Sequence, residues 1–169
     1  DNFILYKPKD LVAGDFYWMD AFAKDDFGNY LKPLDTEVNP ADCIIFAVAD
    51  CTGHGVPGAM ISIFCSNALN RAIKEFYLLD PGNILDKVRS LVIETFEKSD
   101  MEVSDGMDIS LCVFNFRTFE LYWAGANNPL WLVRNQEMVE YKPDRQPIGK
   151  FDNPTNFKTH KIQLEKGDK

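Results

Sequence analysis

The sequence predicts a single α+β domain in which helices pack against an antiparallel sheet. Three observations support this prediction. Strand-like segments precede residue 50, two segments with helical periodicity follow one another from residue 57, and short strands separated by turns fill the C-terminal third. Because the helical segments are adjacent and do not alternate with strands, the pattern does not favour a wound βαβ fold.

The N-terminal region contains three candidate strands. Residues 3–6 (FILY) and 12–20 (VAGDFYWMD) are rich in aromatic and aliphatic side chains, as strands are. Residues 43–49 form a nearly continuous apolar run, which predicts a strand buried on both faces. Residues 25–29 (DDFGN), between the last two candidates, are typical of a hairpin tip.

Two amphipathic helices are predicted in the middle of the chain. Apolar residues recur every three or four positions over residues 57–78 and again over residues 81–98. Pro57 suits the first turn of the first helix, and Asp80 suits the N-cap of the second. The short link between the helices predicts that they lie antiparallel and cover one face of the sheet.

The C-terminal third is predicted to consist of strands joined by turns. The strand segments, in order, are 109–116, 119–124, 129–133, 138–141 and 157–164. Arg117-Thr118 separates the first two and Asn135-Gln136 the next two, which predicts two hairpins. Residues 144–149 (DRQPIG) are predicted to form a loop.

Composition limits the possible functions. The chain has 169 residues, 46% of them hydrophobic, which suits one domain with a real core. Its net charge of -8 argues against a nucleic-acid partner, whereas surplus carboxylates suit divalent cations and, equally, simple solubility. No apolar run reaches the roughly 20 residues that span a bilayer. Four cysteines without a CxxC pair predict reduced thiols in a cytoplasmic protein.

Two aspartates, Asp15 and Asp50, stand beside glycines at the ends of apolar segments. A carboxylate in such surroundings is partly desolvated and needs a compensating cation, or its pKa rises. Two converging carboxylates would suit Mg²⁺ or Mn²⁺, which prefer oxygen ligands. The backbone carbonyl of Cys51 is a third candidate ligand, because the glycines that follow let the chain turn its carbonyls inward.

The same residues also have structural interpretations. A Gly-Asp pair in a strand is often a bulge or a turn, so Asp15 need not bind anything. Asp50 would equally serve to cap the turn that precedes the first helix. The spacing alone leaves both alternatives open.

The motifs AGDFYW (13–18) and FAVADCTGHGVPGAM (46–60), with AGANNPLWLVRN (124–135) and DRQPIG (144–149) downstream, resemble the SpoIIE-like branch of the metal-dependent (PPM-type) serine/threonine protein phosphatases. The resemblance runs in order over essentially the whole chain. It implies a β-sandwich flanked by helices in α/β/β/α layers and a site for two Mn²⁺ or Mg²⁺ ions. It also implies that a metal-bound water attacks phosphoserine or phosphothreonine directly.

The resemblance extends to individual residues. Asp15 matches the first metal ligand of the family, Asp50 the bridging ligand, and Cys51 the residue that lends its carbonyl. The family's remaining metal-binding aspartates lie in a later DG strand end and a final Asp-Asp motif, and neither is found in this sequence. Residues 1–169 are therefore expected to be one incomplete phosphatase domain, with little activity by itself.

Two further residues are weaker candidates. His54 would act as a general acid or contact the phosphate, or would simply be a turn histidine touching solvent. Asp108, within SDGMDISL, would be a metal ligand or support one, or would cap the edge of a strand. No catalytic side chain is assigned from the sequence.

Two classes of function follow from the sequence. The first is an enzyme, a bacterial-type signalling phosphatase whose substrate is a phosphorylated regulatory protein and whose parent chain carries an upstream sensor domain. The second is a non-catalytic module of the same fold that binds a partner and lacks a full set of metal ligands.

Overall fold

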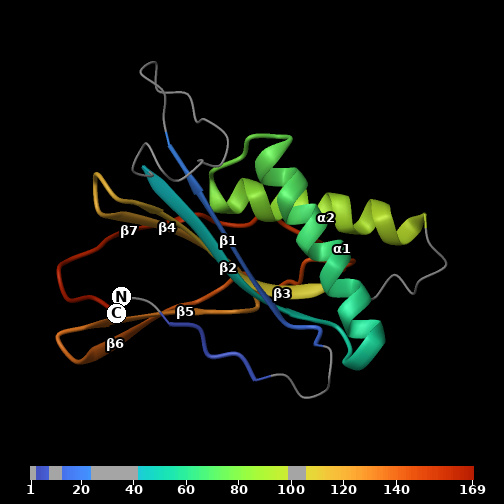
Figure 1. Ribbon diagram of the computed structural model, residues 1–169, viewed down its shortest axis with the longest axis horizontal. Helices are drawn as coiled ribbons and strands as arrows, with labels where there is room; N and C mark the ends of the chain where they lie inside the picture. The colour runs from blue at the N-terminus through green and yellow to red at the C-terminus, as the bar shows by residue number, and fades with distance from the viewer. Residues whose placement is uncertain (1–2, 8–12, 24–41, 99–105) are drawn as a thin grey trace.

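The computed structural model describes residues 3–7, 13–23, 42–98 and 106–169, and it shows seven strands and two helices in these ranges (Figure 1). In chain order the elements are β1 (Phe16–Phe22), β2 (Cys43–Cys51), α1 (Gly55–Lys74), α2 (Pro81–Glu97), β3 (Met107–Asn115), β4 (Glu120–Ala126), β5 (Leu130–Arg134), β6 (Glu137–Tyr141) and β7 (His160–Gln163).

Five of the strands form one antiparallel sheet in the order β1-β2-β3-β4-β7, and β5 and β6 form a separate hairpin. The helices are consecutive in the chain and lie together on one side of the large sheet (Figure 1). The predicted α+β class is therefore confirmed, because helices and antiparallel strands occupy separate layers.

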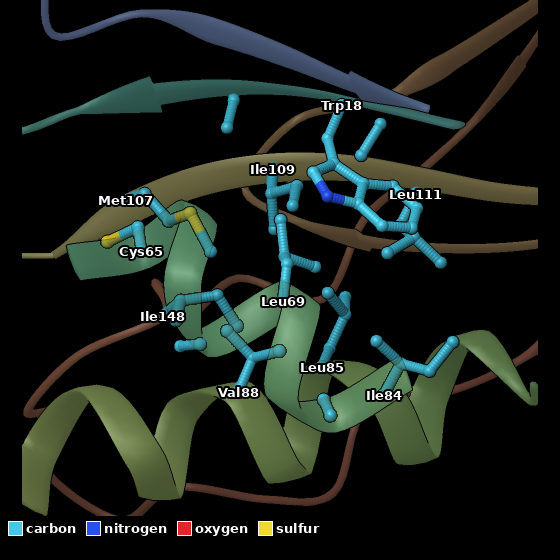
Figure 2. Packing of buried hydrophobic residues seen from close by; sticks show 14 of the residues in the cluster. Trp18, Cys65, Leu69, Ile84, Leu85, Val88, Met107, Ile109, Leu111 and Ile148 are labelled. Carbon is cyan, nitrogen blue, oxygen red and sulfur yellow. The ribbon is translucent and has the colours of Figure 1, made fainter. Parts of the chain in front are cut away.

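The two helices meet the sheet through one hydrophobic core (Figure 2). Leu69 of α1, Val88 of α2 and Ile109 of β3 are completely buried there. As predicted, the side chain of Asp80 caps α2, accepting a hydrogen bond of 3.0 Å from the backbone of Asn83. The first helix begins at Gly55, two residues before the expected start, so that Pro57 still lies in its first turn.

The prediction that β2 is buried on both faces was wrong. Its side chains alternate: Ile45 and Ala47 face the helices and are buried, whereas Phe46 and Val48 on the opposite face are 40% and 54% exposed. Apolar residues on both faces of a strand predict burial only if both faces of the sheet are covered. Here the helices cover one face, and we call the opposite face the outer face.

The β5–β6 hairpin covers only part of the outer face. A second hydrophobic cluster joins Leu132 of β5 to Trp123 of β4 and Ile162 of β7. The other part, over β1 and β2, keeps Tyr17 and Met19 more than half exposed. A groove of about 910 Å³ runs along this part of the outer face toward β5.

Other segments differ in detail from the sequence predictions. Residues 3–6 do not form a strand, and Phe3 is 91% exposed. The β3–β4 turn spans residues 116–119, with Phe119 at a positive φ, so it is longer than the expected two residues. The β5–β6 turn at Asn135-Gln136 is as predicted, with both residues at positive φ. The hairpin tip expected at 25–29 lies outside the described residues.

The core between α1 and the sheet should be sensitive to cavities. Leu69→Ala is expected to lower the free energy of unfolding by about 2–5 kcal/mol, since it removes a fully buried side chain. Ile63→Ala in the same helix is the matched control, because Ile63 is 59% exposed, and it should cost less than about 1 kcal/mol. Urea denaturation would measure both, and equal losses would contradict the packing described here.

Candidate metal centre

The strand register places three aspartates in a row at one end of the outer face. Asp50 follows Phe46 and Val48 on the outward-facing positions of β2, and its partner across the β2–β3 ladder is Asp108. Asp15 directly precedes β1, next to the Phe16–Ala49 pair. Alternation along antiparallel strands therefore brings all three carboxylates to the same edge and the same face.

The carboxyl groups of Asp15 and Asp50 lie close enough together to interact directly. The pKa of Asp50 is raised, first by burial of its carboxyl, then by the neighbouring Asp15 carboxyl and by the negative charges of Asp15 and Asp108. Two ionised carboxylates this close repel each other, and a cation between them would relieve the repulsion. The predicted convergence of Asp15 and Asp50 is confirmed.

The glycines around the aspartates allow three backbone segments to approach closely. A Cβ atom on Gly14 would lie 2.9 Å from the carbonyl oxygen of Gly53 and 3.1 Å from that of Cys51. A Cβ on Gly58, in the first turn of α1, would lie 2.7 Å from the same Gly53 oxygen. Glycine at 14 and 58 thus lets the segment before β1 and the start of α1 pack on the turn after β2.

This packing also places the carbonyl of Cys51 beside the segment that carries Asp15. The thiol of Cys51 lies on the buried side of the strand. Its pKa is raised far above the usual range, first by a hydrogen bond with Cys65 and then by burial. Of the two groups on this residue, the carbonyl is the one suited to a hard cation, in agreement with the sequence argument.

Hydrogen bonds hold the start of β3 against the turn after β2. The backbone N–H of Thr52 donates to the carbonyl of Gly106 at 2.9 Å, and the Thr52 hydroxyl both donates to this carbonyl and accepts from the Gly106 N–H. Because Gly106 lies two residues before Asp108, this contact fixes the third carboxylate relative to the other two.

Asp108 has a partner that the sequence did not predict. The side-chain N–H of Asn127 donates a 2.9 Å hydrogen bond to Asp108 Oδ1. Asn127 follows β4 directly and has a positive φ of 54°, a conformation that asparagine tolerates better than most residues. Nothing in the sequence indicated this contact, because the contact depends on strand register. Asp108 is thus near Asp50 and already bound to a neighbouring side chain.

A cleft of about 370 Å³ opens beside two of these aspartates, Asp50 and Asp108. Its lining includes Asp50, His54 and Asp108 together with Pro147 and Gly149 of the DRQPIG loop. His54 is the N-cap residue of α1, and its side chain makes no capping hydrogen bond to the helix. The structure therefore brings both weaker candidates to the same cleft as Asp50. Asp105, which precedes Asp108 by three residues in the sequence, lies outside the described residues.

The donors present fit part of a site for a divalent cation. Asp15, Asp50 and the Cys51 carbonyl offer oxygen atoms, and the pKa of Asp50 is raised first by burial and then by the neighbouring carboxyl groups, both of which a bound cation would offset. Within the described ranges, however, no three His, Cys, Asp or Glu side chains are grouped so that they could hold a metal ion.

Comparison with known proteins identifies the family. The family model described as Stage II sporulation protein E (SpoIIE) matches residues 40–169, which is more than half of the chain. The chain belongs to the SpoIIE family. No curated protein sequence matches it. None of the described helices is long and apolar enough to cross a membrane.

Solved structures show the same fold. The SiaA-PP2C domain of Pseudomonas aeruginosa has a TM-score of 0.76 and 28% identity over 98% of this chain and 57% of that one. The PP2C phosphatase domain of SpoIIE from Bacillus subtilis, with a fragment of its regulatory domain, has a TM-score of 0.67 and 16% identity over 94% of this chain and 39% of that one. RsbX in complex with magnesium has a TM-score of 0.60 and 20% identity over 97% of this chain and 67% of that one.

These matches establish a PP2C-like fold and membership of the PPM-type phosphatases, as the motifs predicted. The SpoIIE-family chain spans little more than half the length of the SiaA structure and less than half of the SpoIIE structure.

Manganese should stabilise the protein through the aspartate row. At a hundredfold excess over the dissociation constant, Mn²⁺ is expected to raise the melting temperature of the intact protein by about 5–10 °C, since it binds only the folded state. Asp50→Asn should remove most of this shift. Asp152→Asn, at an exposed aspartate, is the control and should keep it. Thermal unfolding with and without Mn²⁺ checks this, and equal shifts in both variants would contradict a site at Asp50.

Proposed function

We propose that this chain forms part of the catalytic domain of a metal-dependent protein serine/threonine phosphatase. The observation that carries the proposal is the convergence of Asp15 and Asp50 beside the Cys51 carbonyl, at a cleft in a PP2C-like fold. Membership of the SpoIIE family supports the reaction class. The magnesium in the similar RsbX structure supports the choice of a hard divalent cation.

In this proposal the carboxylates of Asp15 and Asp50 and the carbonyl of Cys51 would hold Mn²⁺ or Mg²⁺, two ions by the family resemblance. When bound, the ions would supply a water of lowered pKa and neutralise charge on the phosphoryl group. The carboxylate of Asp50 would balance part of their charge. The first turn of α1 adds partial positive charge on the side of the cleft where His54 lies.

Two carboxylates and one carbonyl are too few protein ligands for two ions. We propose that the remaining ligands come from parts of the whole protein that these 169 residues do not include. Asp108, and Asp105 in the undescribed segment, are alternatives within the chain. The hydrogen bond from Asn127 leaves Asp108 with one carboxylate oxygen for this role.

We further propose that the substrate is a phosphorylated regulatory protein and that a sensor domain precedes this domain in the parent chain. Two of the similar structures are described with regulatory or partner domains. The four cysteines are buried and none is part of a disulfide, which suits the reducing cytoplasm.

A second candidate is a non-catalytic module that binds a partner through the same fold. The incomplete ligand set among the described residues favours it. The two candidates differ in one property, because only the enzyme needs metal ions for its function.

Asp50→Asn should abolish phosphatase activity of the intact protein. The amide keeps the shape of the side chain but loses the charge that holds the ions, so hydrolysis of a phosphoserine or phosphothreonine peptide with Mn²⁺ should fall by at least about a thousandfold. Asp152→Asn should leave activity unchanged. Full activity of Asp50→Asn would refute the two-metal mechanism, and absence of activity in the wild type would favour the binding module.

Residues 1–169 alone should be nearly inactive and should bind Mn²⁺ weakly, because the ligand set is incomplete. Calorimetry with Mn²⁺ and the same peptide assay, applied to this fragment and to the intact protein, would check the expectation. Full activity of the fragment would show that the missing ligands lie within it, and Asp105 and Asp108 would then be the first to substitute.

A further inference from the structure

The DRQPIG loop forms one wall of the cleft but belongs to a part of the chain far from Asp50. Its residues Pro147 and Gly149 line the cleft together with Asp50, His54 and Asp108. The position of this wall therefore sets the width of the opening beside Asp50 and Asp108. What holds the loop in place decides how well the cleft fits a substrate.

Backbone hydrogen bonds attach the loop to the sheet at two points. The N–H and the carbonyl of Asp144 bond to the Gly125 carbonyl and the Asn127 N–H at the end of β4, both at 3.0 Å. Ile148 and Met107 exchange both of their backbone hydrogen bonds, at 2.8 and 3.0 Å. Between these points the side chain of Gln146 provides a third attachment, which includes a hydrogen bond with Arg89 of α2.

Gln146 is only 3% exposed, and all of its polar capacity is used. Its amide N–H donates to the carbonyl of Thr155 at 2.8 Å. Its oxygen accepts from the Thr155 N–H at 3.0 Å and from the Arg89 guanidinium at 3.1 Å. A buried amide with this many partners has one allowed position, so it fixes the residue that precedes Pro147.

Arg89 connects this amide to α2. Its guanidinium also donates to the Thr155 carbonyl at 2.9 Å and pairs with Asp86 one turn earlier at 2.9 Å. It lies over the ring of Phe157, 4.9 Å from the centroid. Because its side chain is only 12% exposed, the guanidinium is held from several sides. Helix α2, the DRQPIG loop and residues 155–157 thus form one connected unit.

We propose that Gln146, held by Arg89, is a positioning residue that sets the cleft wall at Pro147–Gly149 for substrate binding. This inference rests on the proposed phosphatase function for its kinetic part. Its structural part, that Gln146 and Arg89 fix the loop, stands independently of the reaction. Neither residue touches the aspartate row, so the effect on catalysis is indirect.

The test uses the intact protein and compares Gln146→Ala with Gln163→Ala. Gln163 is the control, since its amide also donates to backbone carbonyls, those of Thr118 and Phe119, but it is exposed and does not line the cleft. Hydrogen exchange of the peptide around residues 144–149 is expected to accelerate about tenfold in Gln146→Ala and to remain unchanged in Gln163→Ala.

Kinetics give the second measurement. With a phosphopeptide and Mn²⁺, Gln146→Ala should lower kcat/KM about tenfold, mainly through a higher KM, because the displaced wall no longer fits the substrate. Gln146→Glu keeps the acceptor for Arg89 but loses the donor to Thr155, and it should lie between Gln146→Ala and the wild type. A merely structural role would lower the melting temperature and leave KM unchanged.

The outcomes separate the two proposals. If the wild type does not hydrolyse the peptide, the proposed function fails, and the exchange measurement alone decides whether Gln146 positions the loop. If Gln146→Ala shows the same hydrogen exchange and the same KM as Gln163→Ala, the inference is overturned. If Gln146→Ala does not fold, Arg89→Lys replaces it, because lysine keeps the charge but loses the forked contact to Gln146 and Thr155. Arg89→Lys is expected to show the same faster hydrogen exchange around residues 144–149 and the same higher KM. If it shows neither, the inference is also overturned.

Discussion

Repulsion between the carboxylates of Asp15 and Asp50 is the constraint on which the rest of the site depends. The register of β1, β2 and β3 places these groups and Asp108 in one row, and the pKa of Asp50 is raised first by burial and then by these neighbouring carboxyl groups. Holding two carboxylates this close lowers the stability of the fold when no cation is bound. A purely structural site would not need such a pair, so the pair indicates a functional site. The row therefore connects the fold to the proposed metal chemistry.

The surrounding backbone is arranged to keep this row together. Gly14 and Gly58 allow the segment before β1 and the first turn of α1 to touch the turn after β2. Thr52 then holds this turn to the start of β3 through Gly106. The opposite wall is attached to α2 through Gln146 and Arg89. Each contact joins segments distant in sequence, so the cleft exists only in the folded domain.

Local patterns predicted much of this structure. Apolar periodicity gave both helices, Asn135-Gln136 gave the β5–β6 turn, and glycine-flanked aspartates gave the convergence of Asp15 and Asp50. The exposure of Val48 could not be predicted, because it depends on how far the hairpin extends over the outer face. The roles of Asn127 and Gln146 were also hidden, since their partners lie 19 and 57 residues away. Pairings at such separations are set by the register of strands and the docking of loops.

If Asp15 and Asp50 hold divalent metal ions at the end of the outer face, a crystal structure of the intact protein grown with Mn²⁺ should show them through the anomalous scattering of manganese. Anomalous peaks are expected in contact with both carboxylates and the Cys51 carbonyl, with Asp50 between two ions. Well-ordered manganese elsewhere, with none in contact with Asp15 or Asp50, would show that these aspartates are not metal ligands.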